Sequence, residues 1–181
     1  SPLDTAKIVE VIRDRKCNTL FTTPSFLSSY MRKADPPELA SLKFVVVGAE
    51  KLKQPLSDAF AEKFGVRPLE GYGTTEMSPV VSLNLPDLIK EPERQICSKA
   101  GSIGIPLPGI AVRIADLDTG EPVPPGRAGM LLVKGPNRML GYLGRDDLTA
   151  SSITDGWYRT GDVAKMDDDG FVYITDRLHR F

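Results

Sequence analysis

Apolar positions in the first hundred residues alternate between helical and extended patterns. The first helical stripe follows Asp4, a residue type that caps helix N-termini well. A continuously apolar run, Phe44-Val45-Val46-Val47, has the character of a strand buried on both faces. Alternating helices and strands predict a mostly parallel α/β layer over residues 1–98. The helices and strands predicted in this way cover residues 3–15, 19–23, 25–32, 44–47 and 55–64.

The pattern changes beyond residue 99, where short apolar runs are separated by glycine, proline and aspartate. Asp118-Thr119-Gly120 and Asp168-Asp169-Gly170 are typical of hairpin turns, because aspartate and glycine tolerate positive φ angles. These features predict a small antiparallel, β-barrel-like subdomain over residues 99–175. The charged, proline-bearing residues 86–99 predict a surface connection. The strands expected here cover residues 111–115, 129–133 and 171–174.

Composition narrows the class of protein without identifying it. The formal net charge of −1 gives no electrostatic argument for a nucleic acid partner. No apolar run approaches the roughly 20 residues that span a bilayer. Cys17 and Cys97 lie far apart and near no metal-ligand pattern, which favours two reduced thiols. We therefore expect a cytoplasmic protein.

Residues 71–76, Gly-Tyr-Gly-Thr-Thr-Glu, are the most informative stretch for chemistry. Gly71 and Gly73 allow close approach of the backbone to a ligand, and Tyr72 offers a ring for stacking. Threonine hydroxyls can bind phosphate oxygens, and Glu76 is a natural magnesium ligand beside phosphate. The alternative is a glycine-rich loop that only turns the chain. The stretch is neither G-x-G-x-x-G nor a P-loop, so a Rossmann site and a P-loop site are both disfavoured.

A second candidate is Asp162, which follows Thr160 and Gly161. A carboxylate accepts two hydrogen bonds at once and can hold both hydroxyls of a ribose, although an aspartate in a turn is more often a local cap. Asp176 and Arg177 form a third candidate, and an exposed Asp-Arg pair is ordinarily solvated surface. The single histidine, His179, has no partner for a zinc site or a hydrolase triad in this sequence. It is read as a surface residue.

Taken together, these motifs resemble the acyl-adenylate-forming superfamily of acyl-CoA synthetases, luciferases and peptide-synthetase adenylation domains. Residues 71–76 match its Gly-Tyr-Gly-x-Thr-Glu signature, and residues 156–162 match Gly-Trp-x-x-Thr-Gly-Asp. Residues 47–50 match the loop whose backbone borders adenine. The motifs occur in the order of the family, so the resemblance covers nearly the whole chain.

The resemblance implies a role for each matched residue. Gly48, Ala49 and Glu50 would border adenine, and Tyr72 would lie against it between Gly71 and Gly73. Thr75 would contact the phosphate and Glu76 would hold Mg²⁺, which makes these two the expected catalytic residues. Asp162 would hold the ribose and Arg177 would contact the nucleotide. Asp176 would lie at a hinge, with residues 176–181 opening a connection to a further domain.

The resemblance further implies an ATP-dependent ligase that activates a carboxylic acid as acyl-AMP and transfers the acyl group to a thiol. The thiol would belong to coenzyme A or to the phosphopantetheine of an acyl carrier protein. Residues 48–52 and 177–181 look most like the acyl-ACP synthetase region of bacterial 2-acylglycerophosphoethanolamine acyltransferases. That narrower resemblance implies a long-chain fatty acid substrate and a role in phospholipid metabolism. It would allow the longer enzyme to associate with the inner membrane.

The family's phosphate-binding lysine loop and its catalytic C-terminal lysine have no counterpart among these residues. We therefore expect an internal fragment of a larger adenylating enzyme, inactive by itself. The alternative is a non-catalytic module that binds AMP as a sensor or scaffold. A structural α/β domain without a ligand would require every motif match to be accidental.

Overall fold

The computed structural model describes residues 3–178, and the chain forms two compact units, Ser1–Gly71 and Tyr72–Phe181. This division falls earlier than the predicted boundary after residue 98, which lies inside the second unit. The two boundaries differ because residues 72–98 pack with the second unit, although the sequence pattern of short strands begins only after them. The assignment of residues 1–98, 99–175 and 176–181 to parts of a family domain stays a prediction.

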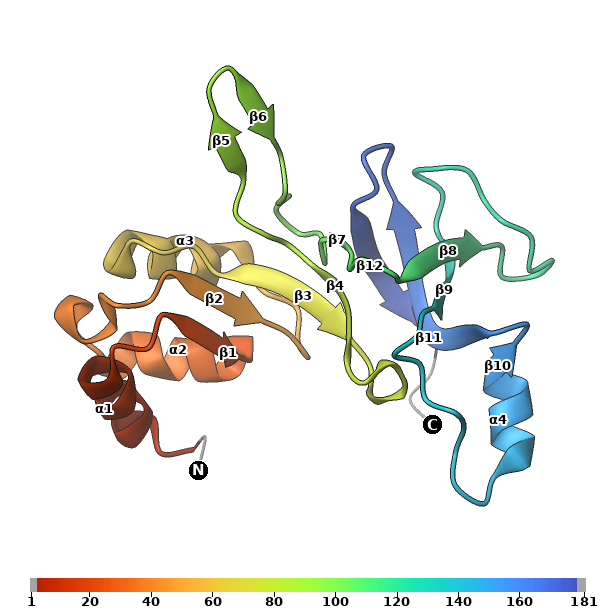
Figure 1. Cartoon of the computed structure of the whole chain (residues 1–181), viewed down its shortest axis with the longest axis horizontal. Coiled ribbons are helices and arrows are strands. Elements are labelled where there is room, and N and C mark those ends of the chain that lie inside the picture. Colours follow the sequence, from red (N-terminus) through yellow and green to blue (C-terminus); the bar gives the residue numbers. More distant parts are fainter. Residues whose placement is uncertain (1–2, 179–181) are drawn as a thin grey trace. The chain divides into compact units, whose positions relative to one another are not determined.

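The first unit alternates helices with parallel strands, as predicted (Figure 1). Strand β1 pairs with β2 and β2 with β3, both in parallel. The predicted strand at residues 44–47 is confirmed with the same bounds. Strand β3 was not predicted, and its last two residues, Tyr72 and Gly73, belong to the second unit. The elements are α1 (Thr5–Arg15), β1 (Thr19–Thr22), α2 (Pro24–Lys33), η1 (Pro36–Leu39), β2 (Phe44–Val47), α3 (Gln54–Phe64) and β3 (Leu69–Gly73).

Local chemistry explains where these helices begin and end. The Asp4 side chain accepts a hydrogen bond from the Lys7 amide at 3.1 Å and caps α1, as the sequence predicted. Thr23 caps α2 in the same way, and Pro24 occupies its first turn, where no amide donor is needed. Gly65 ends α3 at φ 71°, a left-handed conformation that glycine adopts without strain.

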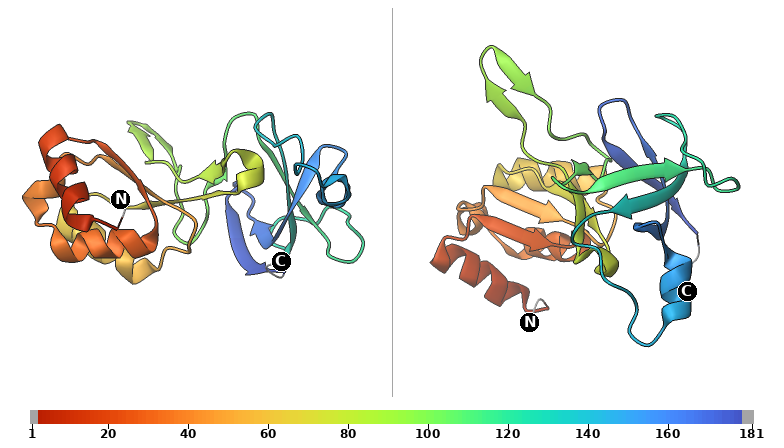
Figure 2. Two further views of the ribbon diagram at one scale, coloured as in Figure 1. Left: turned by 90° about the horizontal axis from the view of Figure 1, so that it is seen from below. Right: turned by 45° about the vertical axis from the view of Figure 1, so that its right-hand side comes forward.

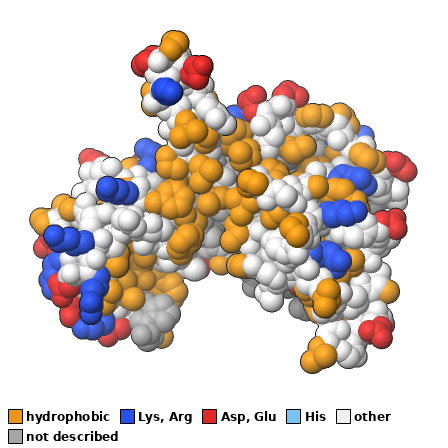
Figure 3. Space-filling model, in the orientation of Figure 1, with side chains coloured by type: hydrophobic (Ala, Val, Ile, Leu, Met, Phe, Trp, Pro, Cys, Tyr) orange, Lys and Arg blue, Asp and Glu red, His pale blue; other side chains and the backbone are white. Residues whose placement is uncertain are grey.

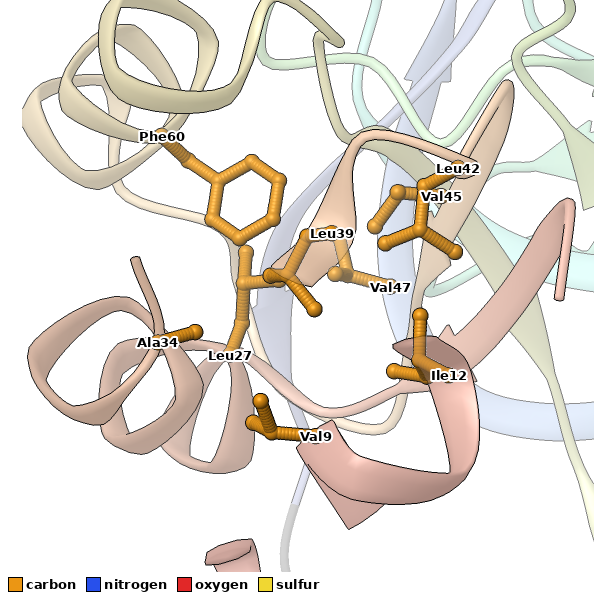
Figure 4. Packing of buried hydrophobic residues seen from close by; sticks show 9 residues of the cluster. All are labelled: Val9, Ile12, Leu27, Ala34, Leu39, Leu42, Val45, Val47 and Phe60. Carbon is orange, nitrogen blue, oxygen red and sulfur yellow. The ribbon is translucent and has the colours of Figure 1, made fainter. Parts of the chain in front are cut away.

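The core of the first unit lies between the helices and one face of β2 (Figure 4). Val45 and Val47 of β2 meet apolar side chains from all three helices, and Phe60 of α3 is fully buried among them. This burial couples the helices to the strand whose end carries Gly48. The remaining buried members of the cluster are Val9, Ile12, Leu27, Ala34, Leu39 and Leu42.

The second unit is built mainly from antiparallel strands. Its main sheet has the order β10-β11-β9-β8, and β12 also pairs with β11. The predicted antiparallel sheet is confirmed, but the expected barrel-like closure is not, because the paired strands of residues 72–178 form an open sheet. The elements are η2 (Thr75–Met77), β4 (Val80–Leu83), β5 (Leu88–Lys90), β6 (Glu93–Gln95), β7 (Ile105–Pro106), β8 (Ala111–Ala115), β9 (Gly129–Lys134), α4 (Asp146–Ser152), β10 (Ile153–Thr154), β11 (Trp157–Met166) and β12 (Val172–Arg177).

Two segments of the second unit differ from the sequence prediction. The surface connection over residues 86–99 contains the exposed hairpin β5–β6, which projects from the other strands of its unit (Figures 1 and 2). The short helix α4 was not predicted, since its seven residues bury no side chain and leave no apolar stripe in the sequence. No helix within residues 3–178 has the length and apolar character needed to cross a membrane.

The buried ring of Phe60 gives a test of the first unit's core. We expect Phe60→Ala to lower the free energy of unfolding by about 3–5 kcal/mol, because it leaves a cavity among fully buried side chains. Phe21→Ala is the matched control, since the Phe21 side chain is 70% exposed, and we expect less than about 1 kcal/mol. Urea unfolding followed by circular dichroism measures both, and equal losses would contradict the packing described here.

Candidate functional site

In the first unit, the predicted adenine-bordering residues follow the carboxyl end of a parallel strand. Gly48 comes directly after β2, and its amide donates to the Thr22 carbonyl at 3.1 Å. A Cβ added to Gly48 would lie 3.4 Å from the Gly71 carbonyl oxygen, so these two candidate glycines are neighbours. The carboxyl ends of parallel strands are where open α/β sheets bind ligands.

The loop after Gly48 holds an unusual backbone conformation. Ala49 has φ 66°, a left-handed value that costs a residue with a Cβ roughly 1–2 kcal/mol. Strained backbone of this kind concentrates at ligand-binding sites. Glu50 follows, and its carboxylate accepts a hydrogen bond from the Ser25 hydroxyl at 2.6 Å. The first unit therefore fixes Gly48, Ala49 and Glu50 in one defined turn.

In the second unit, residues 73–79 form a tight loop rather than a loose glycine-rich connection. The Thr74 amide donates to the Pro79 carbonyl at 2.8 Å, and a Cβ on Gly73 would lie 2.1 Å from that same oxygen. Met77 is fully buried in the core of the second unit and thereby anchors η2. The exposed side chain of Thr75 makes no hydrogen bond within the described part of the chain, which leaves its hydroxyl free to donate.

Glu76, the predicted magnesium ligand, is held at both its side chain and its backbone. Its Oε1 accepts a hydrogen bond from the Tyr142 hydroxyl at 2.8 Å, and its carbonyl accepts from the Met139 amide at 2.8 Å. The pKa of Tyr142 is raised, first by burial and then by this carboxylate. The pKa of nearby Tyr158 is raised for the same reasons, so both phenols stay protonated.

Tyr142 and Tyr158 were missed by sequence reasoning. Tyr142 is 66 residues from Glu76 and lies in a loop, so neither spacing nor periodicity connects them. Tyr158 lies inside the recognised motif of residues 156–162, at a position where that motif allows any residue. Only its alternation with Thr160 along a strand could have indicated that these two side chains face the same side.

Asp162 lies within a strand and not after a turn, which corrects the sequence prediction. Gly161 does have φ 79°, as a turn would require, but it forms an irregularity in β11, where the register with β9 shifts. The Asp162 amide donates to the Thr160 hydroxyl at 3.1 Å, and that hydroxyl donates to the Leu131 carbonyl at 2.9 Å. The strand therefore fixes the carboxylate firmly.

The structure brings three predicted nucleotide-binding residues together. The Tyr72 hydroxyl donates to Oδ2 of Asp162, a residue that is only 5% exposed. Burial raises the pKa of Tyr72, and the neighbouring carboxylate adds to this effect. Arg177 lies opposite Asp162 in the β11–β12 register, with Nε 3.4 Å from Oδ1. Oδ1 accepts no hydrogen bond among residues 3–178, so it has lone pairs for a hydroxyl donor.

Asp176, the predicted hinge residue, lies in β12 opposite Val163. Its Oδ1 accepts a hydrogen bond from the Arg177 amide at 2.7 Å. The hinge role stays a prediction, and His179 and the other residues of 179–181 lie outside the described residues.

The donor set suits a magnesium ion that arrives with a phosphate. Within residues 3–178, no three His, Cys, Asp or Glu side chains gather into a metal cluster. Magnesium does not need such a cluster, because it often takes one or two carboxylates and completes its shell with phosphate oxygens and water. Tyr142 donates to Oε1 of Glu76 and Tyr158 also acts on this carboxylate, so a bound cation would share it with two phenols.

Fold and motifs together define a nucleotide-binding class of enzyme, and comparison with known proteins assigns the family. A family model described as AMP-binding enzyme matches residues 1–143, and the chain belongs to this family. The long-chain-fatty-acid–CoA ligase of Salmonella typhimurium is 42% identical over 140 residues, covering 77% of this chain and 23% of that protein. Feruloyl-CoA synthase of Amycolatopsis is 33% identical over 183 residues, covering 98% of this chain and 35% of that protein.

Solved structures agree with this assignment. Apo MatB from Rhodopseudomonas palustris matches with a TM-score of 0.82 at 29% identity, over 96% of this chain and 33% of that chain. The amide bond synthetase McbA from Marinactinospora thermotolerans matches with a TM-score of 0.83 at 30% identity, over 97% of this chain and 35% of that chain. The chain thus spans about a quarter to a third of the proteins it resembles.

Two glycines of the candidate site give a matched pair of variants. We expect Gly73→Ala to distort the 73–79 loop and to lower nucleotide binding, because the new Cβ would overlap the Pro79 carbonyl oxygen. Gly48→Ala should be tolerated, since its Cβ would lie at ordinary contact distance. Calorimetric titration of the full-length protein with ATP, beside thermal melts, compares the two. Equal ATP affinity in both variants would exclude a tight loop at Gly73.

Proposed function

We propose that this chain is the central part of an ATP-dependent ligase that adenylates a fatty acid and transfers the acyl group to a thiol. The observation that carries the proposal is the pair of anchored carboxylates, Glu76 held by Tyr142 and Asp162 held by Tyr72. The family assignment supports an adenylating enzyme, and the name of the Salmonella relative supports a long-chain fatty acid. A solved structure of ATP-bound MatB, with a TM-score of 0.81, supports ATP as the nucleotide.

In the first step, a carboxylate oxygen of the fatty acid attacks the α-phosphorus of ATP. A new oxygen–phosphorus bond forms, the bond to pyrophosphate breaks, and acyl-AMP results. Thr75 would donate its free hydroxyl to an α-phosphate oxygen, where negative charge concentrates. Glu76 would hold Mg²⁺, which neutralises phosphate charge when bound. Asp162 would accept hydrogen bonds from the ribose and so orient the phosphorus toward the acid.

In the second step, a thiol sulfur attacks the acyl carbonyl carbon and the bond to AMP breaks. The two CoA ligase relatives support coenzyme A as the acceptor. An acyl carrier protein and a role in phospholipid metabolism rest on the resemblance of the short segments 48–52 and 177–181 alone. Since the chain spans only part of its relatives, we expect these 181 residues alone not to adenylate.

Carboxylate-dependent ATP–pyrophosphate exchange by the full-length enzyme tests the proposal. We expect exchange with long-chain fatty acids and a loss of roughly 100-fold or more in Glu76→Ala and Asp162→Ala, because each removes a charged group at the nucleotide. Glu62→Ala is a control with the same loss of charge, since Glu62 is exposed on α3 and belongs to no part of the candidate site. Folded protein that binds AMP but exchanges with no acid would instead identify a non-catalytic sensor.

Tyr142 gives a separate prediction as a positioning residue. We expect Tyr142→Phe to lower exchange about tenfold and to raise the Mg²⁺ concentration needed for half-maximal rate, because Glu76 loses a charge-assisted hydrogen bond. Tyr173→Phe removes the same hydroxyl from a bond to Asp167, at 3.3 Å, and should leave exchange unchanged. An unchanged Mg²⁺ dependence in Tyr142→Phe would exclude Tyr142 from positioning Glu76.

A further inference from the structure

The last two carbonyl groups of η2 take their hydrogen bonds from a distant segment of the same unit. A 3₁₀ helix of three residues cannot satisfy the carbonyls at its own end. The Met139 amide donates to the Glu76 carbonyl at 2.8 Å, and the side-chain amide of Asn137 donates to the Met77 carbonyl. The same nitrogen donates to the Val80 carbonyl at 3.1 Å. The two hydrogens of one amide group thus bridge the turn that follows Glu76.

A tight turn presents Asn137 to η2. Pro136 and Asn137 are its central residues, and the Arg138 amide closes it by donating to the Gly135 carbonyl at 3.2 Å. Proline at the second position of such a turn fixes the backbone in advance. Gly135 leaves room for the asparagine, because a Cβ on Gly135 would lie 2.8 Å from Asn137 Oδ1. The turn therefore holds the amide in place without a ligand.

Apolar burial does not hold this segment against η2. Leu140 and Leu143, which follow Asn137 in the same loop, are fully exposed, and Figure 3 shows apolar side chains at the surface in this region, at the lower right. Asn137 Oδ1 is buried and has no hydrogen-bond partner within residues 3–178. A buried acceptor without a partner costs stability, so packing does not account for an asparagine here. The contribution of this side chain is its two donors.

We propose that Asn137 is a positioning residue for the metal and phosphate groups of ATP. By holding η2 through two backbone carbonyls, it keeps the Glu76 carboxylate and the Thr75 hydroxyl in the arrangement that magnesium-bound ATP requires. This inference rests on the proposed ligase function. Asn137 acts on the backbone of η2, whereas Tyr142 acts on the Glu76 side chain. Groups that are ordered before binding spare the ligand the cost of ordering them, so losing this order lowers affinity.

The alternative is a purely structural role, and Asn84 supplies the comparison. Asn84 follows the last residue of β4, at the opposite end of that strand from η2. It is 3% exposed, and its side-chain amide donates to the Ser102 carbonyl at 2.8 Å. Asn84→Ala therefore removes a matched buried amide. If Asn137 only supported the fold, the two alanine variants would affect ATP binding alike.

Calorimetric titration of the full-length enzyme with ATP, with Mg²⁺ and separately in excess EDTA, tests the proposal. We expect Asn137→Ala to weaken magnesium-bound ATP roughly tenfold and ATP in EDTA less than about twofold, because the metal binds through Glu76. Asn137→Asp keeps the shape but replaces the donors with acceptors that face two carbonyls, so it should lose at least as much. Asn84→Ala should lower Tm and keep the ratio of the two affinities.

Gly135→Ala tests the same contact with Asn137 unchanged. The new Cβ would displace the Asn137 amide, so magnesium-bound ATP should again bind more weakly than in the wild type. Thermal melts show which variants are folded, and Gly135→Ala replaces any Asn137 variant that misfolds.

The outcomes separate this proposal from the ligase function. Equal losses of affinity with and without Mg²⁺, or the same change of ratio in Asn84→Ala, would overturn the positioning role. Full affinity for magnesium-bound ATP in Asn137→Asp would also overturn it. Magnesium-bound ATP affinity that depends on Asn137, in a wild-type enzyme that shows no ATP–pyrophosphate exchange with any acid, would remove the ligase function and keep the positioning role. A wild-type enzyme that binds no ATP would overturn both.

Discussion

The buried carboxylate of Asp162 is the constraint on which the second unit's candidate site depends. An ionised group that is 5% exposed is costly to bury unless donors surround it. The Tyr72 hydroxyl supplies one donor and Arg177 supplies a positive charge, while Thr160 fixes the backbone beneath. Removing one partner would leave a buried charge unpaired, so Tyr72, β11 and β12 must keep their positions together. Tyr72 of the glycine-rich motif is thereby tied to a strand ninety residues later.

A tyrosine also holds the second carboxylate of the candidate site, that of Glu76, which is less buried than Asp162. Glu76 is half-buried, and Tyr142 donates to its Oε1 while Tyr158 also acts on the carboxylate. Asp162 is buried, whereas the half-buried Glu76 is more open to a cation that arrives with a phosphate. A ribose needs a fixed acceptor and a metal needs an accessible one, so the two carboxylates suit the different tasks proposed for them.

Much of the fold follows from the sequence because its signals are local. The cap at Asp4 and the apolar run of β2 each act within a few residues. β11 was missed because Thr160-Gly161-Asp162 has turn chemistry, and the left-handed Gly161 belongs to a strand irregularity that only pairing with β9 reveals. The site residues were found through motifs, whereas Tyr142 was not, because a contact across 66 residues leaves no local pattern. The predicted contacts with adenine, phosphate and metal remain predictions.

The alternation of β11 links the candidate site to the surface behind it. Before the irregularity at Gly161, successive side chains of β11 point to opposite faces, so Tyr158 and Thr160 are buried while Arg159 between them is exposed. The register that aligns Arg159 with Leu132 and Arg113 is the same register that packs Tyr158 against Val133 in the core. A one-residue slip of this register would turn Tyr158 and Thr160 to the exposed face and Arg159 into the core. Core packing of the second unit therefore fixes the buried face of β11, which carries Tyr158 and Thr160, against the exposed face behind it.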